Sequence, residues 1–572
     1  MSLRFLYESY QKTGLTSNST KIILSPSNSF NYFNSQEPCI EFGDTRVHVI
    51  GNQRYFNAFR SKKIDVDVFK NHECKNLEYG FVAIQEGDTI DIYNDIFGAY
   101  PLFISRKNNE VSLSNFFDFT EDDELDTVAV IQFIHFNHIL KERTLSKQTR
   151  RIQGGSHISI NNKGLSCNVL NGWKSLEKEL FGLPKDVQQI TSWSTFKNFI
   201  KESKKEDNPN VLTLTGGFDS RLLFGVLLDS GELFHTLTWG QEGNLQTKTA
   251  ERISQQYNIA HREIKLDASF QSEINQYLEE IITTGSESPF AIDIPQFIHM
   301  CKALDKGTNL ISGFMGSEII RGPSYSSQVT LTEFAADIAL AESRSRIKEI
   351  IYDFQKNHSF IEDTQIETYI ETLVNDYVAY SRVERDKTEK NHSIFRYLFL
   401  EKYPKIYGPI IKLHLDHDIN LINPFMNLDF IKLMLHENKA ATKLKPYEGN
   451  AFYNFKLYKY YANALKDIYP DLNNTMVDRG YQIKDLTSTI GLIKLPLFQI
   501  YRKYLRQKTN KGTPTVDSKK WYHSHLKSLP KNLNPKLIPI LNLDGNLKSE
   551  HPSSFDAIKC QLIMGLNKKI KS

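Results

Sequence analysis

The segment "VLTLTGGFDSRLLFG", residues 211–225, contains a short apolar run, a pair of glycines, and then a second apolar run. Residues 211–215 predict a buried parallel strand, and the stretch that begins at Ser220 predicts a helix. The glycine pair between them, Gly216 and Gly217, lets backbone amides approach a ligand closely. Because such amides and the start of a helix both favour negative charge, the segment predicts an anion site suited to phosphate.

Two polar residues follow the glycine pair. Asp219 offers a hard oxygen ligand for Mg²⁺, and the Ser220 hydroxyl can donate to a phosphate oxygen. The more common phosphate loop, GxxxxGK[ST], is absent from the sequence, and its nearest imitation at 242–249 lacks both glycines. A purely structural alternative stays open, in which the glycines form a tight turn and Asp219 caps the helix.

The first part of the chain, residues 1–178, is rich in predicted strands. Segments 45–51, 79–95 and 100–106 alternate apolar and polar residues and are separated by Gly, Asp and Asn. Apolar residues at helical spacing predict a helix over 126–140. This part is therefore expected to form a mostly antiparallel first domain.

The second part of the chain has a different pattern. Apolar strands are predicted at 233–239 and 309–314, with helical segments between them, which favours a parallel sheet in an α/β domain. Residues 330–470 are predicted to be mostly helical. We predict that this domain covers 179–500 and that residues 501–572 form a Lys- and Asn-rich helical extension.

The composition is that of a globular protein. Of 572 residues, 40% are hydrophobic and 24% are charged, and the formal net charge of +3 gives no reason to expect nucleic acid as a partner. The five cysteines include no CxxC pair, which favours a reducing compartment. No signal peptide and no apolar run of about 18 residues is evident. We therefore expect a cytoplasmic protein without a membrane partner.

Several motifs in this order resemble the asparagine synthetase family. "TGGFDS" (215–220) resembles its SGGxDS pyrophosphatase loop, and "ISGFMGSEIIRG" (311–322) resembles its GxGxDE-type turn. "NDIFGAYPLF" (94–103) is similar to the D-x-x-G-x-x-P-L-Y pattern of its glutaminase-like domain, and "DINLINPFMNLDFIKLM" (418–434) to its segment ending in PFLD. The resemblance covers most of residues 45–490.

The resemblance implies a fold, an activity and a set of site residues. The fold would be an Ntn-type αββα sandwich followed by a Rossmann-like, PP-loop parallel-sheet domain with a helical C-terminal part. The activity would be that of an ATP-dependent ligase that adenylates a carboxylate, releases pyrophosphate and forms an amide. Asp219 and Glu318 would hold Mg²⁺ and act in catalysis. The residues implied for ATP binding are Leu214, Thr215, Gly216, Gly217, Asp219, Ser220, Leu237, Thr238 and Gly313.

The sequence departs from the family pattern at three places in this domain. Ser317 stands where the family has a metal-binding aspartate, so the second metal contact would come from Glu318 or through water. Phe314 stands where some members carry a base for the incoming amine. The late catalytic lysine is displaced, leaving Arg479 or Lys484, of which Arg479 is preferred as a bidentate cation.

The first domain also departs from the family. The family's glutaminase uses an N-terminal cysteine, whereas position 2 is Ser2 and the nearest cysteine is Cys39. Because an unassisted serine is a far weaker nucleophile than a thiolate, we expect this domain to have lost ammonia production. The expected partners are a small-molecule or peptide carboxylate and an amine or ammonia donor, with a homodimer possible. Ammonia-dependent asparagine synthesis and a nucleotide-binding protein without turnover remain as alternatives.

Overall fold

The computed structural model describes most of the chain between residues 39 and 495, together with short segments on either side. The described residues are 3–5, 21–24, 39–107, 110–117, 119, 122–161, 164–170, 173–181, 192–283, 294–320, 332–358, 361–383, 385, 392–436, 451–477, 481–491, 494–495, 535–537 and 539–541.

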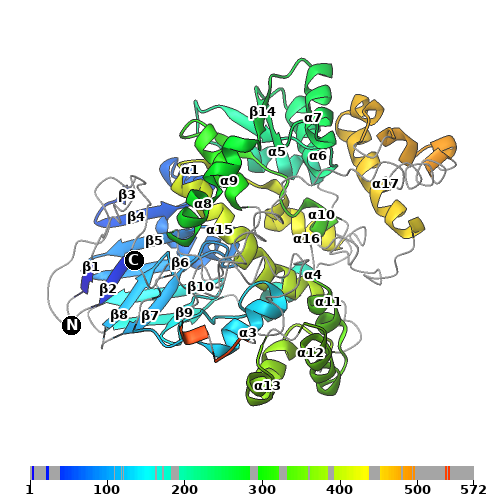
Figure 1. Ribbon diagram of the computed structural model, residues 1–572. Coiled ribbons are helices and arrows are strands. Elements are labelled where there is room, and N and C mark those ends of the chain that lie inside the picture. Colours follow the sequence, from blue (N-terminus) through cyan, green and yellow to red (C-terminus); the bar gives the residue numbers. More distant parts are fainter. Residues whose placement is uncertain are drawn as a thin grey trace.

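Two antiparallel sheets form the first part of the chain, coloured blue and cyan in Figure 1. One sheet has the order β1-β2-β8-β7-β9, and the other has the order β11-β10-β6-β5-β4-β3. The strands are β1 (Leu3–Phe5), β2 (Lys21–Leu24), β3 (Cys39–Phe42), β4 (Thr45–Ile50), β5 (Phe81–Glu86), β6 (Thr89–Asn94), β7 (Phe103–Lys107), β8 (Glu110–Ser114), β9 (Thr149–Arg151), β10 (Ser156–Asn161) and β11 (Gly164–Val169).

The alternation along β5 separates two cores. Phe81 and Ala83 pack between the two sheets, whereas Val82 and Ile84 belong to the core beneath helices α1 (Gln53–Arg60) and α2 (Val66–Asn71). Successive side chains of a strand point to opposite faces, so one apolar run can serve both layers.

The outer face of the sheet β1-β2-β8-β7-β9 is covered by helices from two distant parts of the chain. Helix α3 (Thr127–Phe136) shares one apolar core with α11 (Glu333–Leu340), α12 (Arg344–His358) and α13 (Asp363–Val378). Phe334 and Tyr377 from these later helices both pack against Phe136 of α3. The helix, sheet, sheet, helix layering confirms the expected αββα sandwich, and the helix predicted at 126–140 is confirmed.

A segment near the end of the chain completes this core. Residues 535–541 include the turn η9 (Pro535–Leu537), and Leu541 forms a bridge with Ile361 beside α13. The Ile540 carbonyl accepts the Glu362 amide at 3.0 Å. The Lys536 ammonium donates to the Asp123 carbonyl at 2.6 Å. The segment therefore connects the sandwich to the later helices.

The D-x-x-G segment of the first domain is a structural turn. The buried Asp95 carboxylate accepts the backbone amides of Phe97, Ala99 and Tyr100 at 2.8 to 3.1 Å. Gly98 has a φ of 67°, and a Cβ at this position would lie 2.9 Å from the Gly154 nitrogen. Only glycine fits such a close approach in the left-handed region.

The second part of the chain is built around a five-stranded parallel sheet in the order β14-β13-β12-β15-β16. Its strands are β12 (Asn210–Thr213), β13 (His235–Gly240), β14 (His261–Lys265), β15 (Asn309–Ile311) and β16 (Asn420–Ile422). Strand order reverses between β12 and β15, and in sheets of this kind ligands bind where the carboxyl ends of such strands meet. The strands predicted at 211–215, 233–239 and 309–314 are confirmed.

Helices surround this sheet, shown mainly in green and yellow in Figure 1. They include α5 (Ser192–Ser203), α6 (Asp219–Asp229), α7 (Leu245–Gln256), α8 (Ala268–Thr283), α9 (Ile294–Ala303), α10 (Gly316–Ile320), α14 (His392–Tyr397), the π-helix η3 (Leu398–Tyr407), α15 (Gly408–Asp416), α16 (Leu428–His436) and α17 (Ala451–Ile468). The mostly helical character predicted for 330–470 is confirmed over the residues of that range that the structure describes, and the Rossmann-like domain and the α/β class are confirmed. The boundaries at 178 and 500 stay a prediction.

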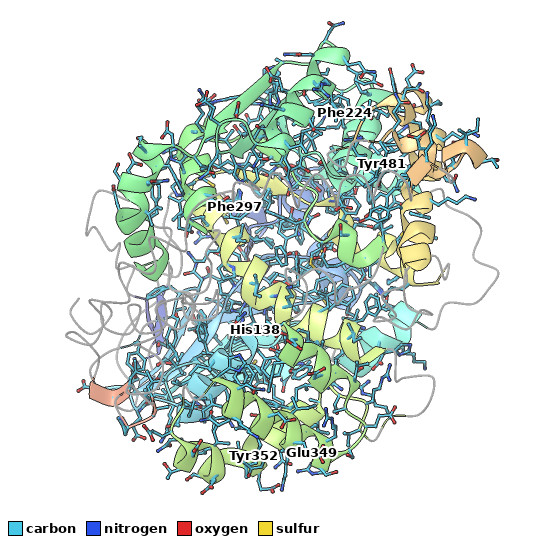
Figure 2. The ribbon with its side chains drawn as sticks, turned by 45° about the vertical axis from the view of Figure 1, so that its right-hand side comes forward. His138, Phe224, Phe297, Glu349, Tyr352 and Tyr481 are labelled. Atoms are coloured by element: carbon cyan, nitrogen blue, oxygen red, sulfur yellow. The ribbon has the colours of Figure 1, made fainter. Side chains whose placement is uncertain are left out.

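The two parts of the chain meet at the end of α3. His138 lies near the middle of Figure 2 and is buried against Tyr397, with ring centroids 5.6 Å apart. Burial lowers the pKa of His138 well below its usual value, and the nearby Lys405 and Lys402 charges of η3 lower it further.

Among the described helices, none combines the length and the hydropathy needed to cross a bilayer.

Candidate active site at the switch of the parallel sheet

Two turns face each other at the switch point of the sheet. The first connects β12 to α6, and the second connects β15 to α10. Gly313 and Gly316 of the second turn allow the contact, since a Cβ at Gly313 would lie 3.2 Å from the Ser220 nitrogen. A Cβ at Gly316 would lie 2.8 Å from the Asp219 carboxyl carbon. The two turns are therefore packed as closely as glycine permits.

The first turn is held by a small network of its own hydroxyls. The Thr215 amide donates to the Ser220 hydroxyl at 3.1 Å, and the two hydroxyl oxygens also lie 3.1 Å apart. The Gly217 amide donates to the Thr215 hydroxyl at 3.1 Å. Thr215 and Ser220 thus set the curvature of the loop.

Arg221 anchors this turn from behind. Its guanidinium is fully buried and donates to the Gly216 carbonyl at 3.3 Å and to the Thr475 hydroxyl at 3.1 Å. A residue of the C-terminal part of the domain therefore helps to fix the glycine pair.

The Asp219 carboxylate lies between the two turns and α17. One of its oxygens accepts the Ser317 hydroxyl at 2.6 Å, and the other accepts the Tyr461 hydroxyl. The Tyr461 ring also packs against Phe218, with centroids 5.2 Å apart. Ser317, which stands where the family has an aspartate, is therefore placed to orient a carboxylate.

The second turn carries backbone strain. Met315 is buried and has a φ of 66°, a region that non-glycine residues other than Asn and Asp rarely occupy. Residues held in such conformations cluster at functional sites. The strained residue stands directly before Gly316 and Ser317, which contact Asp219.

A buried charge pair lies beside the second turn. Glu318 is buried in α10, and Lys402 is buried in η3. Burial lowers the pKa of Lys402 to about 8, while the neighbouring Glu318 carboxylate opposes that fall. A π-helical segment such as η3 is itself frequent at functional sites.

Three of the residues implied for ATP binding have side chains that are buried in the domain. Leu214, Leu237 and Thr238 are all buried, and the Leu214 amide donates to the Leu237 carbonyl at 2.8 Å. Any contact with a nucleotide at these positions would come from backbone atoms.

The remaining predicted residues are placed differently. The Phe314 ring packs against Phe297 and Tyr407, with centroids 5.5 and 5.6 Å apart. Lys484 is exposed and donates to the Asn474 side chain at 3.1 Å. Arg479 lies outside the described residues.

The donor set is compatible with magnesium. Mg²⁺ is usually held by one or two carboxylates, together with substrate phosphates and water. Asp219 and Glu318 supply two carboxylates, and a carboxylate oxygen that accepts a hydroxyl, as both Asp219 oxygens do, can also bind a cation. In the part of the chain that the structure describes, no cluster of three or more His, Cys, Asp or Glu residues suits a metal. Phosphate oxygens would therefore have to complete the coordination.

Three residues of this region had no sequence signal. Tyr461, Lys402 and Thr475 reach the turns from α17, η3 and the segment after α17. No local motif marks them, because they meet the turns only through the packing of distant segments.

Comparison with known proteins identifies the domain that carries this site. Residues 194–434 match the model of the family described as asparagine synthase. No curated protein sequence matches the chain significantly.

Two solved structures show similarity to the chain at low sequence identity. One is described as the allosteric regulatory enzyme of purine biosynthesis, with 9% identity, 41% of this chain and 63% of that chain covered, and a TM-score of 0.15. The other is a glutamine phosphoribosylpyrophosphate amidotransferase from B. subtilis complexed with ADP and GMP, with 10% identity, coverages of 56% and 72%, and a TM-score of 0.14. The chain thus spans less than two thirds of the first of these structures.

Both facing turns, 215–220 and 313–318, fall inside the family match. The region that carries the candidate site is therefore the region that is similar to the asparagine synthase family.

Proposed function

We propose that this chain is an ATP-dependent ligase that forms an amide. A carboxylate oxygen of a small molecule or peptide attacks the α-phosphorus of ATP, and the bond to the β-phosphate breaks to release pyrophosphate. An amine or ammonia then attacks the acyl-adenylate, the C–N bond forms, and AMP leaves. The observation that carries this proposal is the contact of two glycine-containing turns, with Asp219 between them, at the switch point of the sheet.

The first turn would hold the phosphates. The amides of Gly216 and Gly217 and the start of α6 supply positive potential without a side-chain charge. Thr215 and Ser220 would exchange their mutual hydrogen bonds for phosphate oxygens. Their short side chains keep this exchange local to the loop.

The carboxylates of Asp219 and Glu318 would hold magnesium. Bound Mg²⁺ neutralises charge that develops on the transferring phosphate groups. Ser317 and Tyr461 orient the Asp219 carboxylate by donating to its two oxygens. A carboxylate fixed in this way needs little reorganisation when the nucleotide binds.

Lys402 would supply a positive charge beside the second turn. Its ammonium interacts with Glu318 and is buried, so the charge acts in a medium of low dielectric constant. Arg479 remains the proposed second cation, from the C-terminal part of the domain.

The source of ammonia in this proposal is not the first domain. The three cysteines within residues 1–178 are Cys39, Cys74 and Cys167. Burial raises the pKa of all three thiols, so none is poised as a thiolate. We therefore propose that ammonia from solution, or an amine substrate, attacks the adenylate. Release of glutamate from glutamine by the purified protein would contradict this part of the proposal.

ATP–pyrophosphate exchange tests the proposed adenylation directly. Radiolabelled pyrophosphate should enter ATP only when a suitable carboxylate is present, so a panel of amino acids, including aspartate, and peptides is scanned. Asp219→Asn should abolish the exchange, because the variant removes the metal-binding charge but keeps the shape. Exchange that persists in this variant would refute the role of Asp219.

One observation favours a second candidate, a nucleotide-binding protein without turnover. Ser317 replaces the family's aspartate, and its hydroxyl occupies one oxygen of Asp219. In this case, the protein would bind ATP tightly but show no exchange with any carboxylate of the panel.

A further inference from the structure

A cavity of about 480 Å³ lies where the sandwich meets the later helices. On the side of the sandwich, its wall is formed by the turn after Asp95 and by residues 141–143 and 150–154. On the other side, it is formed by residues of α13, α14 and η3 and by the residues just after α13. None of its lining residues belongs to the facing turns 215–220 and 313–318, so it is separate from the candidate active site.

The cavity wall has an excess of positive charge. Three acidic residues line it, Glu142, Asp376 and Glu401. The six cationic residues that line it are Lys141, Arg143, Arg150, Arg151, Arg396 and Lys405. With all groups ionised, the wall therefore carries three positive charges more than negative ones. An excess of this size in a cavity attracts anions.

Two of the acidic residues are already satisfied by the protein. Asp376 accepts the Lys141 ammonium at 2.7 Å and the Arg143 guanidinium at 3.2 Å. Glu401 accepts the Lys141 amide at 3.0 Å and also the Tyr380 hydroxyl. Burial raises the pKa of Glu401, which favours its neutral form and so increases the positive balance.

Arg396 is the cation most clearly available to a ligand. Its guanidinium carbon lies 6.0 Å from the centre of the Tyr380 ring, and its Nε is buried without a hydrogen-bond partner among the described residues. An unsatisfied buried donor is costly and is uncommon in native structures. The Nε of Arg396 therefore points to an acceptor that the described residues do not supply.

Arg151 and Arg150 extend the cationic wall toward the sandwich. Arg151 is buried and bridges the two parts, donating to the Gly98 carbonyl at 2.8 Å and to the Pro404 carbonyl at 3.0 Å. Arg150 is exposed at the edge and makes a long contact of 3.4 Å with the Thr149 carbonyl. These carbonyls are neutral, so they satisfy donors without removing net charge.

We propose that this cavity binds a small oxyanion carrying two or three negative charges, with phosphate or carboxylate groups. Guanidinium groups match the planar, bidentate geometry of both kinds of oxyanion. The volume falls in the range of small-molecule sites, and Phe97, Leu400 and Pro404 add apolar wall for an organic part of the ligand. The proposal goes beyond the ligase function and does not depend on it.

Direct binding measurements on the full chain test this site. Inorganic pyrophosphate and citrate serve as separate probes, titrated by calorimetry in EDTA at constant low ionic strength. Magnesium is left out so that binding at the Asp219 turn contributes little. Tighter binding of pyrophosphate identifies a phosphate ligand, and tighter binding of citrate a polycarboxylate. Absence of binding by both probes would overturn the proposal.

Variants assign any binding to the cavity. The double variant Arg150→Gln and Arg396→Gln should weaken binding at least about tenfold, because it removes charge-assisted hydrogen bonds. Arg396→Lys keeps the positive charge but loses the planar, bidentate donor geometry of the guanidinium group, so it should retain part of the affinity.

Arg346→Gln is the matched control for these variants. It makes the same chemical change on α12, in the same helix as Glu349 and Tyr352, which are labelled at the lower edge of Figure 2. This control should bind like the wild type. Wild-type affinity in the double variant, with a cooperative thermal transition, would refute the site.

One variant separates the proposed anion site from the proposed ligase site. Asp219→Asn should leave magnesium-free binding of the probe unchanged while it abolishes ATP–pyrophosphate exchange. Loss of exchange without loss of probe binding separates the two sites. Loss of probe binding in Asp219→Asn would place the anion at the active site and overturn the proposal.

Discussion

Replacing Gly316 by alanine tests the contact between the two turns. The added Cβ would lie 2.8 Å from the carboxyl carbon and from one oxygen of Asp219, whereas ordinary contact begins at 3.4 Å. The carboxylate must therefore move by about 0.6 Å. Because Mg²⁺ demands near-ideal geometry from its ligands, we expect about a tenfold loss in magnesium-dependent ATP binding.

The assay compares ATP affinity with and without magnesium. Wild-type protein should bind ATP more tightly when Mg²⁺ is added, and Gly316→Ala should lose most of that gain. Alanine is favoured over glycine in a helix by about 1 kcal/mol, so a weaker fold is not expected to explain the loss. The thermal transition of each variant checks this point.

Gly225→Ala is the matched control. It lies in α6, and its added Cβ would meet the flexible Leu472 methyl at 3.0 Å, with no carboxylate in contact. This variant should keep the full magnesium effect. If Gly316→Ala also kept it, the inferred position of Asp219 in the metal site would be wrong.

Three further predictions concern single groups. Tyr461→Phe removes the hydroxyl that donates to Asp219, so ATP–pyrophosphate exchange should fall several-fold while the thermal midpoint changes little; an unchanged exchange rate would show that Tyr461 does not position the carboxylate. Lys402 loses its proton above a pKa of about 8, so exchange should decline as the pH rises through 8, and Lys402→Arg should remove that decline because arginine stays charged; an identical profile in the variant would contradict a role for the ammonium. Burial lowers the pKa of His414 to about 4, so the unfolded chain binds a proton below about pH 6.5 that the folded chain excludes, and stability is lost as the pH falls. Between pH 7 and pH 5 the free energy of unfolding should fall by about 2 kcal/mol for this reason. Calorimetric melting of His414→Leu should show a smaller loss of stability at acid pH, and an equal loss in both proteins would refute the assignment.

Local sequence patterns predicted the parts of the fold that depend on neighbours in the chain. The alternation at 79–95 predicted the β5–β6 hairpin region, and the apolar run at 211–215 predicted β12. The glycine pair correctly indicated a turn between a strand and a helix. Such patterns work because side-chain periodicity follows directly from strand and helix geometry.

The parts that could not be predicted depend on distant segments. Tyr461 lies 242 positions from Asp219, and nothing in the sequence around it signals the contact. The same holds for α11–α13, which are recognisable as helices but whose packing on the first domain is set by the matching of apolar faces. Strand β16 was likewise not predicted, because its three residues, Asn420–Ile422, are too few to show a periodicity.

The prediction for Ser317 shows a different limit. The residue types indicated a weakened metal site, since a hydroxyl is a poor ligand. The structure adds that this hydroxyl donates to Asp219 at 2.6 Å. The residue type tells that a hydroxyl group is present, whereas only the three-dimensional structure tells which group accepts its hydrogen bond.

The segment 535–541 has a consequence for how the polypeptide emerges from the ribosome. Ile361 pairs with Leu541, which is translated 180 residues later. At roughly 5 to 20 residues per second, about 10 to 35 seconds separate the two ends of this pair. During that interval, apolar surface beside α12 and α13 faces water or a chaperone. Nascent chains stalled before residue 535 should therefore bind more chaperone than chains released after residue 541.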